Sequence, residues 1–394
     1  MRRWMTGSEG PVRSTEMTAT TQPPIVDMHP AREPRVRLNG VCPYYTMFPL
    51  DFPLRALADA RPGERVLDPF CGRGTTLFAA RLLGLEAVGI DVNPVAAAIA
   101  EAKLRTSGAR SVTARAVRLI RDNAGASKPE GDFWDLAFHT ETLGQLSALR
   151  AGLAETRNDA AAIVLRALTL GVLHGPLRKG TPAYFSNQMP RTYATKPDAA
   201  VRYWRERGLR PPKVDVVDLL QKRAAYLLAS LPPGGTGRVI CGDARRKLQG
   251  MRGPFARIVT SPPYLGMRTY LPDQWLRGWF LGGPPEPQYT LVGSIGTEDA
   301  DAFANALGET WRAVAKASVT GARLFVRFGS LPSVARDPLK LLMSSIDRAI
   351  CGWQFVGAVE TPVPPRRSRQ ASQFGFSLAS AQIEVDAEFV LSGR

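Results

Sequence analysis

A glycine- and threonine-rich stretch, Asp68-Pro-Phe-Cys-Gly-Arg-Gly-Thr-Thr76, lies between a buried-strand pattern and a helix pattern. Gly72 and Gly74 let the backbone approach a ligand closely, and a helix start favours an anionic group. Leu77 stands where the dinucleotide fingerprint needs a third glycine, and the sequence has no G-x-x-x-x-G-K-[ST] run. Asp91, at the end of the next strand pattern, is placed to accept hydrogen bonds from a ribose diol. This set favours a nucleoside cofactor without pyrophosphate, such as S-adenosylmethionine; a steric glycine turn with a capping aspartate is the alternative.

A second stretch, Thr260-Ser-Pro-Pro-Tyr264, follows the strand pattern 256–260 and should lie at the carboxyl edge of a parallel sheet. Its two prolines stiffen the loop and leave carbonyls free to accept hydrogen bonds. Ser261 Oγ and the Pro262 carbonyl suit the two hydrogens of an exocyclic amino group, while Tyr264 suits stacking on its base. Such orientation turns the nitrogen lone pair towards a sulfonium methyl, so the reaction mainly requires alignment. A plain Pro-Pro turn with a surface tyrosine is the alternative for this stretch alone.

Together, the two stretches resemble the S-adenosylmethionine-dependent DNA amino-methyltransferases, particularly the N4-cytosine branch. The family's cofactor motif, D-P-F-x-G-x-G-T-T, is matched without gaps, and its catalytic motif, [SDN]-P-P-[YFW], is matched in the T-S-P-P-Y form typical of the cytosine branch. The resemblance also includes Pro43-Tyr-Tyr-Thr-Met-Phe-Pro49, Gly89-Ile-Asp-Val-Asn-Pro94, Cys241-Gly-Asp243 and Arg366-Arg-Ser-Arg-Gln370.

The resemblance implies a role for each matched residue. In the cofactor-binding set, Asp68 and Gly72 would contact the methionine part, with Gly74 in the turn and Thr75 or Thr76 at the carboxylate. Phe70 would line the pocket wall or pack near the adenine. Asp91 would bind the ribose, and Asp243 the adenine amino group. The catalytic set would be Ser261, Pro262, Pro263 and Tyr264. These would position and stack a base that is flipped out of the duplex, because its amino group is otherwise engaged in pairing.

The resemblance and the order of elements predict the fold class. We expect an α/β, Rossmann-like class I methyltransferase sheet, mostly parallel with a closing antiparallel strand, interrupted by a helical insertion. Residues 1–38 are predicted to be a disordered or loosely packed arm, 39–104 and 237–394 the two parts of the methyltransferase domain, and 105–236 the insertion and target-recognition region. Thr75 and Thr76 are expected to cap a helix over 77–83, and the strands near 353–360 and 383–391 to form the closing antiparallel pair.

Basic and aromatic residues alternate within the insertion between positions 166 and 213. This segment holds ten Arg or Lys and two acids, a pattern typical of nucleic-acid surfaces. The predicted nucleic-acid-binding residues are Arg178, Lys179, Arg191, Arg202, Tyr203, Trp204, Arg205 and Arg207. The alternative is a helical subdomain whose aromatic residues form its core and whose charges are solvated.

Composition supports a polyanionic partner. The 394 residues carry 51 Lys and Arg against 35 Asp and Glu, a formal net charge of +16. An arginine-rich proteome is the alternative source of this charge. The four cysteines are far apart and form no C-x-x-C pair, which disfavours a metal site and disulfides and fits a reducing cytoplasm. Apolar runs are too short for a membrane span. We expect double-stranded DNA as partner and a cytoplasmic, nucleoid-associated protein of a prokaryote.

These observations favour a site-specific DNA methyltransferase that transfers a methyl group from S-adenosylmethionine to N4 of a flipped cytosine. N6-adenine methylation, RNA base methylation and a non-catalytic nucleic-acid-binding role on the same fold stay open. C5-cytosine methylation is disfavoured because the sequence has no Pro-Cys dipeptide to supply the nucleophile. No nuclease motif is evident, so a restriction nuclease would be a separate protein.

Overall fold

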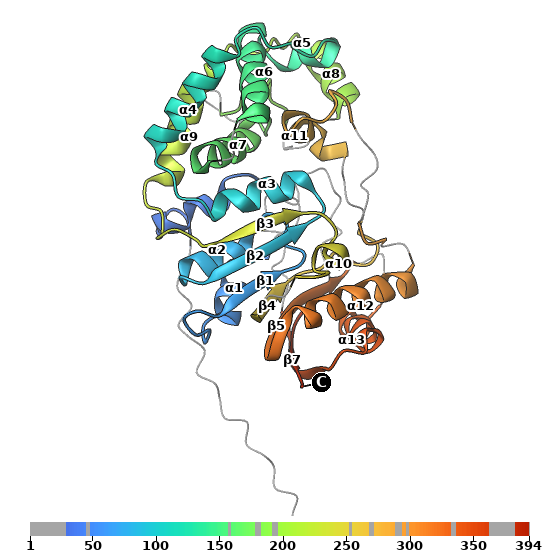
Figure 1. Ribbon diagram of the computed structural model, residues 1–394. Helices are drawn as coiled ribbons and strands as arrows, with labels where there is room; N and C mark the ends of the chain where they lie inside the picture. Colours follow the sequence, from blue (N-terminus) through green and yellow to red (C-terminus); the bar gives the residue numbers. More distant parts are fainter. Residues whose placement is uncertain are drawn as a thin grey trace, which may run out of the picture.

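The computed structural model describes residues 29–44, 48–156, 159–177, 183–190, 196–251, 254–267, 272–287, 294–296, 299–331, 336–361 and 383–393. Within them, a seven-stranded sheet has the order β3-β2-β1-β4-β5-β7-β6 (Figure 1). Its strands are β1 (Arg65–Asp68), β2 (Glu86–Asp91), β3 (Gly237–Cys241), β4 (Phe255–Thr260), β5 (Ser318–Ser330), β6 (Trp353–Thr361) and β7 (Ile383–Leu391). β1 to β5 pair in parallel, while β7 pairs antiparallel with both β5 and β6. The predicted fold class is confirmed.

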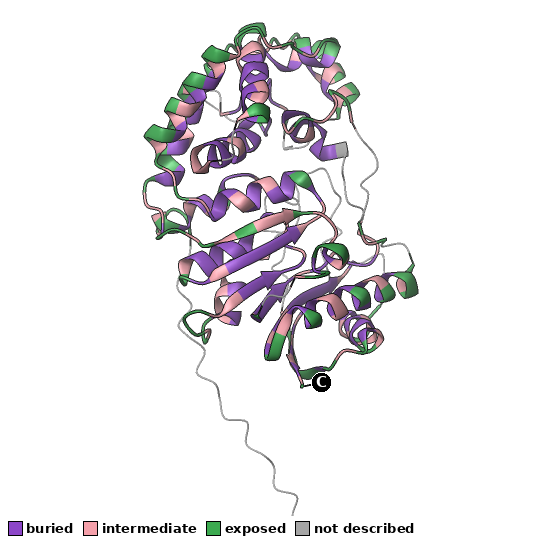
Figure 2. Cartoon of the chain, in the orientation of Figure 1, coloured by how far each residue is buried: buried purple, intermediate pink, exposed green. Residues whose placement is uncertain are grey.

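The central strands are apolar on both faces because helices cover both sides of the sheet. On β1, Val66 and Leu67 point to opposite faces and belong to two separate hydrophobic cores. The first core takes in α1 (Asp51–Ala56), α2 (Thr75–Leu82) and α3 (Pro94–Lys103), and the second α10 (Ala244–Lys247), α12 (Ala300–Lys316) and α13 (Pro338–Ala349). Figure 2 shows the resulting buried sheet between exposed helix faces.

Residues 105–236 form the predicted helical insertion, which extends the first core. Its helices are α4 (Ala109–Asp122), α5 (Asp132–Ala137), α6 (Thr140–Glu155), α7 (Ala160–Val172), α8 (Pro197–Glu206) and α9 (Val216–Leu228). Helix α7 packs on α3, and α4 packs on α6, α7 and α9. The helix α11 (Trp275–Phe280), which follows the catalytic stretch in sequence, contributes side chains to the same core. In Figure 1 these helices form an upper layer above α3.

The segment before the cofactor motif is more ordered than predicted. Residues 34–38, assigned to the loose arm, belong to a 3-10 helix, η1 (Pro34–Gly40), whose Val36 and Leu38 are buried. The helix η1 packs against α9, and Val36 and Leu38 belong to the same hydrophobic core as the apolar residues of α9. Residues 1–28 lie outside the described part of the chain.

The start of α2 also differs from the prediction. Gly74, with φ +79°, is its N-cap, and Thr75 and Thr76 are its first helical residues. A Cβ atom at Gly74 would lie 2.8 Å from Ala100 Cα on α3, so close helix packing requires glycine here. The Thr76 hydroxyl instead donates to the Val259 carbonyl of β4 at 3.1 Å.

The insertion docks on the segment before the cofactor motif through Gly171, and this contact generates a prediction. A Cβ atom at Gly171 would lie 2.2 Å from the Val41 carbonyl oxygen. We expect Gly171→Ala to lower the free energy of unfolding by about 2–4 kcal/mol, because backbone must move. Gly144→Ala on α6 is the control, since its Cβ would meet only Lys128 Cδ at 4.0 Å. It should be neutral or stabilising by about 0.5–1 kcal/mol. Urea denaturation measures both, and equal effects would contradict the docking.

Candidate active site

The loops that follow β1, β2, β3 and β4 lie together at the carboxyl edge of the sheet. The Cys71 amide donates to the Ile90 carbonyl at 2.9 Å, and the Gly242 amide donates to the Asp91 carbonyl at 2.8 Å. The Thr260 hydroxyl donates to Asp68 Oδ1 at 2.6 Å. The two stretches that the sequence singles out are therefore in direct contact, although they are separated by the whole insertion.

Asp68 is the buried centre of this contact. Its Oδ1 also accepts a hydrogen bond from the Phe70 amide at 3.1 Å, while its buried Oδ2 has no partner among the described residues. Burial raises the pKa of Asp68 to about 7, against the hydrogen bonds from the Thr260 hydroxyl and the Phe70 amide that lower it. Near neutral pH this carboxyl is thus poised between its two protonation states, and Oδ2 is the oxygen available to a proton or a cationic group.

Asp91 holds the cofactor loop in place from the end of β2. Its Oδ2 accepts from the Gly72 amide and its Oδ1 from the Asn93 amide, both at 2.8 Å. Burial raises the pKa of Asp91 to about 6, against these two hydrogen bonds. Asn93 also donates from Nδ2 to the Tyr44 hydroxyl at 3.1 Å. Sequence reasoning did not single out Asn93; its position before a helix-starting proline was the available signal.

Asp243 lies at the same edge, but an arginine already holds its carboxylate. It caps α10, and Arg245 donates from Nε to Oδ1 at 3.0 Å and from Nη2 to Oδ2 at 2.8 Å. Arg245 also pairs with Glu309. An adenine amino group would therefore share this carboxylate with Arg245.

The catalytic loop is stiff and largely packed. Ser261 and Pro263 are half-buried, and Pro262 and Tyr264 are buried. The Tyr264 hydroxyl donates to Glu384 Oε1 of β7 at 3.0 Å, and its ring lies edge-on to Phe328 at 5.5 Å between centroids. Burial and the Glu384 charge raise the pKa of Tyr264. The surface-tyrosine alternative is wrong. The sequence does not indicate that Glu384 contacts Tyr264, because the two residues are far apart in the chain and Glu384 belongs to no motif.

The remaining predicted cofactor residues lie around Asp68. Phe70 is half-buried and lies edge-on to Trp311 at 6.1 Å between centroids. Thr75 and Thr76 are both buried, and the Thr76 hydroxyl is committed to β4. Phe70 could wall a pocket as expected, whereas Thr76 serves to join α2 to β4.

The described predicted nucleic-acid residues lie on α8 and at its C-cap, Arg207, and separate into two groups. Arg202, Arg205 and Arg207 are exposed; Arg205 pairs with Asp132 at 2.7 Å, and Arg207 covers the half-buried Tyr203 ring at 4.2 Å. Trp204 is completely buried and donates from Nε1 to the Gln188 carbonyl. It is a core residue, because it shares the inward face of α8 with Ala200, four residues earlier. The predictions for Arg178, Lys179 and Arg191 lie outside the described residues.

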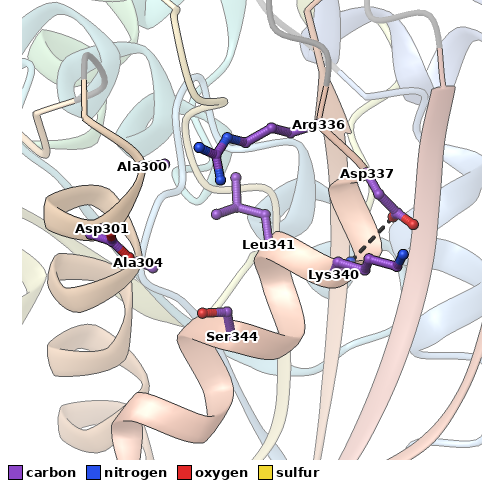
Figure 3. A pocket seen from close by; sticks show the side chains of 8 residues that line it. All are labelled: Ala300, Asp301, Ala304, Arg336, Asp337, Lys340, Leu341 and Ser344. Carbon is purple, nitrogen blue, oxygen red and sulfur yellow. Dashed lines mark hydrogen bonds between the residues drawn. The ribbon is translucent and has the colours of Figure 1, made fainter.

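A shallow hollow lies between the starts of α12 and α13 (Figure 3). Arg336, Lys340 and Asp301 line it, but none of the predicted site residues does. Both helix starts are capped by their own aspartates, Asp299 and Asp337. Among the described residues, no group of His, Cys, Asp and Glu is arranged to hold a metal ion, and no helix is long and apolar enough to span a bilayer.

Parts of the chain are similar to known methyltransferases. Residues 29–102 match the family model N6_N4_Mtase, described as DNA methylase. The chain is 35% identical over 121 residues to the ribosomal protein L11 methyltransferase of Thermus thermophilus, covering 30% of this chain and 43% of that protein. It is 33% identical over 70 residues to the type II methyltransferase M.MjaII of Methanocaldococcus jannaschii, covering 18% of this chain and 13% of that protein. The chain thus spans less than half the length of either relative. The solved rRNA methyltransferase AviRa of Streptomyces viridochromogenes aligns with 91% of this chain and 93% of its own at 14% identity and a TM-score of 0.34.

The raised pKa of Asp68 predicts a pH dependence of stability. Between about pH 4 and 7 the folded chain keeps a proton on Asp68 that the unfolded chain has released, so Asp68 makes the free energy of unfolding fall as pH rises. Asp68→Asn mimics the protonated carboxyl and should flatten this part of the profile by roughly 2–4 kcal/mol. Urea denaturation of both proteins from pH 4 to 8 is the measurement. Parallel profiles would contradict the assignment.

Proposed function

We propose that this chain is an S-adenosylmethionine-dependent DNA methyltransferase that methylates the N4 amine of a flipped cytosine. The observation that carries the proposal is the hydrogen bond from Thr260 to Asp68, which joins the catalytic loop to the cofactor loop. The match of residues 29–102 to the DNA methylases supports the same chemistry. Bound at this edge, S-adenosylmethionine would supply an electrophilic methyl on a sulfonium.

The residues of the site fit this cofactor. Asp68 Oδ2 is a buried acceptor with no partner in the described part of the chain, which suits the ammonium of the methionine part. Gly72 has a positive φ angle and open space where a Cβ atom would lie, so a ligand can approach the loop backbone closely there. Asp91, anchored by two backbone amides, suits the ribose hydroxyls, and Phe70 would wall the pocket.

The catalytic loop supplies orientation and little else. Ser261 Oγ and the Pro262 carbonyl would accept the two amino hydrogens and aim the nitrogen lone pair at the methyl, and the nitrogen then loses one proton to solvent. Tyr264 is braced by Glu384 and Phe328, so the loop meets the base without rearranging.

Double-stranded DNA is the proposed substrate because of where the charge lies. Half of the net charge of +16 falls between positions 166 and 213, and the exposed arginines of α8 belong to this segment. N6-adenine is the second candidate, since the matched family model is named for both N6 and N4. A restriction nuclease, if one exists, would be a separate partner.

Methylation of unmodified plasmid with labelled cofactor, followed by digestion to nucleosides, tests the proposal. Label in N4-methylcytosine is the expected result. Label in N6-methyladenine would reassign the base, and transfer to transcripts but not to duplex DNA would reassign the substrate to RNA. Label in neither nucleic acid would defeat the proposal.

Ser261→Ala provides a second prediction. Loss of one of the two acceptors for the amino group should lower kcat by about 100-fold or more, while cofactor affinity changes less than about threefold, because Ser261 aligns only the base. Ser344→Ala on α13, where the serine is likewise half-buried, is the control and should leave both quantities unchanged. Calorimetry and single-turnover kinetics separate the two effects. Full activity in the Ser261 variant would refute its role.

A further inference from the structure

Arg277 on α11 has a buried guanidinium in which one nitrogen, Nη2, makes no hydrogen bond to the described residues. Its side chain is only 5% exposed; Nε donates to the Leu170 carbonyl at 3.2 Å and Nη1 donates to Gln274 Oε1 at 3.0 Å. Nη2 is buried and has no hydrogen-bond partner within the described part of the chain. Gln274 accepts from Arg277 through Oε1, which leaves its amide nitrogen as a donor, and this Nε2 is also buried and has no partner among the described residues. Two neighbouring, fixed groups thus each offer an unused donor.

This donor pair lies beside the cofactor edge. Arg277 is anchored at Leu170, and the next residue, Gly171, is where residues 41–42 press against α7. Two residues further along, the Tyr44 hydroxyl accepts from Asn93, which in turn bonds to Asp91. Burial and the Asp91 charge raise the pKa of Tyr44, and the positive charge of Arg277 opposes them. A series of contacts thus leads from Arg277 through α7 and residues 41–44 to the end of β2.

A second buried arginine lies in the cofactor loop, and the buried Asp273 directly precedes Gln274. Arg73, in the cofactor loop between Gly72 and Gly74, is buried, its Nε lacks a partner, and burial lowers its pKa to about 10. Burial raises the pKa of the Cys42 thiol, and the charges of Arg277 and Arg73 both oppose this rise. The ion pairs recorded among the described residues include neither arginine. Burying cations without an anion is costly, so an anionic ligand is favoured.

His174 does not add to this charge. It is buried, its Nδ1 lies 2.7 Å from Ser186 Oγ, and burial together with the Arg277 charge lowers its pKa to about 3. The ring is neutral at physiological pH, so the cationic character of the cluster comes from the arginines. A ligand with one negative charge would suit these buried arginines.

We propose that Arg277 Nη2 and Gln274 Nε2 bind the carboxylate of the cofactor's methionine part, with Arg73 of the cofactor loop supplying further positive charge. The proposal rests on the proposed function and extends it to residues outside both motifs. A carboxylate presents two oxygens that two adjacent donors can hold together. A phosphate of the DNA backbone is a poorer occupant, because Arg277 and Gln274 are 5% and 4% exposed and lie within the protein.

The proposal also changes an expectation taken from the family resemblance. Thr75 or Thr76 was expected at the carboxylate, but both are buried and the Thr76 hydroxyl donates to Val259. Arg277 of α11, which packs in the same core as the insertion helices, would therefore supply the carboxylate donor that the cofactor motif lacks.

The test compares two ligands that differ only in the carboxylate: S-adenosylmethionine and decarboxylated S-adenosylmethionine. Calorimetry gives the affinity of the full chain for each. The wild-type chain should bind S-adenosylmethionine about 10- to 100-fold more tightly, as expected for charge-assisted hydrogen bonds. Arg277→Gln should reduce this ratio to within about threefold of unity, while the affinity for the decarboxylated ligand stays close to that of the wild type.

Arg150→Gln is the matched control. Arg150 also anchors α11, donating from Nε to the Trp279 carbonyl at 2.7 Å and from Nη2 to the Gly283 carbonyl at 3.1 Å, but it is no part of the donor pair. Its variant should keep the wild-type ratio even if α11 is loosened. Where Arg277→Gln fails to fold, Gln274→Leu tests the same ratio and should lower it.

The outcomes separate this inference from the proposed function. No binding of S-adenosylmethionine by the wild-type chain would remove both. Equal affinity of the wild-type chain for the two ligands would overturn the carboxylate site and leave the methyltransferase proposal standing. An unchanged ratio in Arg277→Gln would overturn the role of Arg277, including the case in which only DNA affinity falls.

Discussion

The hydrogen bond between the Thr260 hydroxyl and Asp68 Oδ1 is the contact on which the site depends. It lies at the carboxyl ends of two adjacent parallel strands, β1 and β4, in a fully buried position. A buried carboxylate is costly unless it is hydrogen-bonded or protonated, so each partner fixes the other. The Thr76 hydroxyl adds a second link from α2 to β4. The stiff loop that begins at Ser261 consequently emerges beside the glycine loop that begins after Asp68.

The insertion completes this edge. It interrupts the chain after α3 yet packs back on that helix, so its core is continuous with the sheet's first core. Gly171 allows α7 to approach residues 41–42, and Arg277 on α11 reaches the same place from a segment that follows the catalytic loop. Segments from three distant parts of the sequence thus meet over the end of β2. The insertion therefore packs against the segment that contacts the end of β2, and it also carries basic charge.

Much of the fold and part of the site could be predicted from local pattern. Strand 237–241 and the closing antiparallel pair follow from apolar runs between turns, and Gly72 and Asp91 from their positions at strand ends. Other features depend on tertiary packing. Trp204 reads as an interleaved aromatic but faces the core, and Val36 and Leu38 follow a proline-rich stretch yet pack on α9. Glu384 reaches Tyr264, and Arg277 reaches the Leu170 carbonyl, only through chain topology, which no local pattern encodes.

A double-mutant cycle between Thr260→Val and Asp68→Ala tests the central claim most directly. The quantity to measure is the free energy of unfolding of the wild-type chain, the two single variants and the double variant. If the buried bond holds the two loops together, the coupling energy should be about 1–3 kcal/mol. Additive effects of the two substitutions, within about 0.5 kcal/mol, would mean that the loops are positioned independently and would contradict the account.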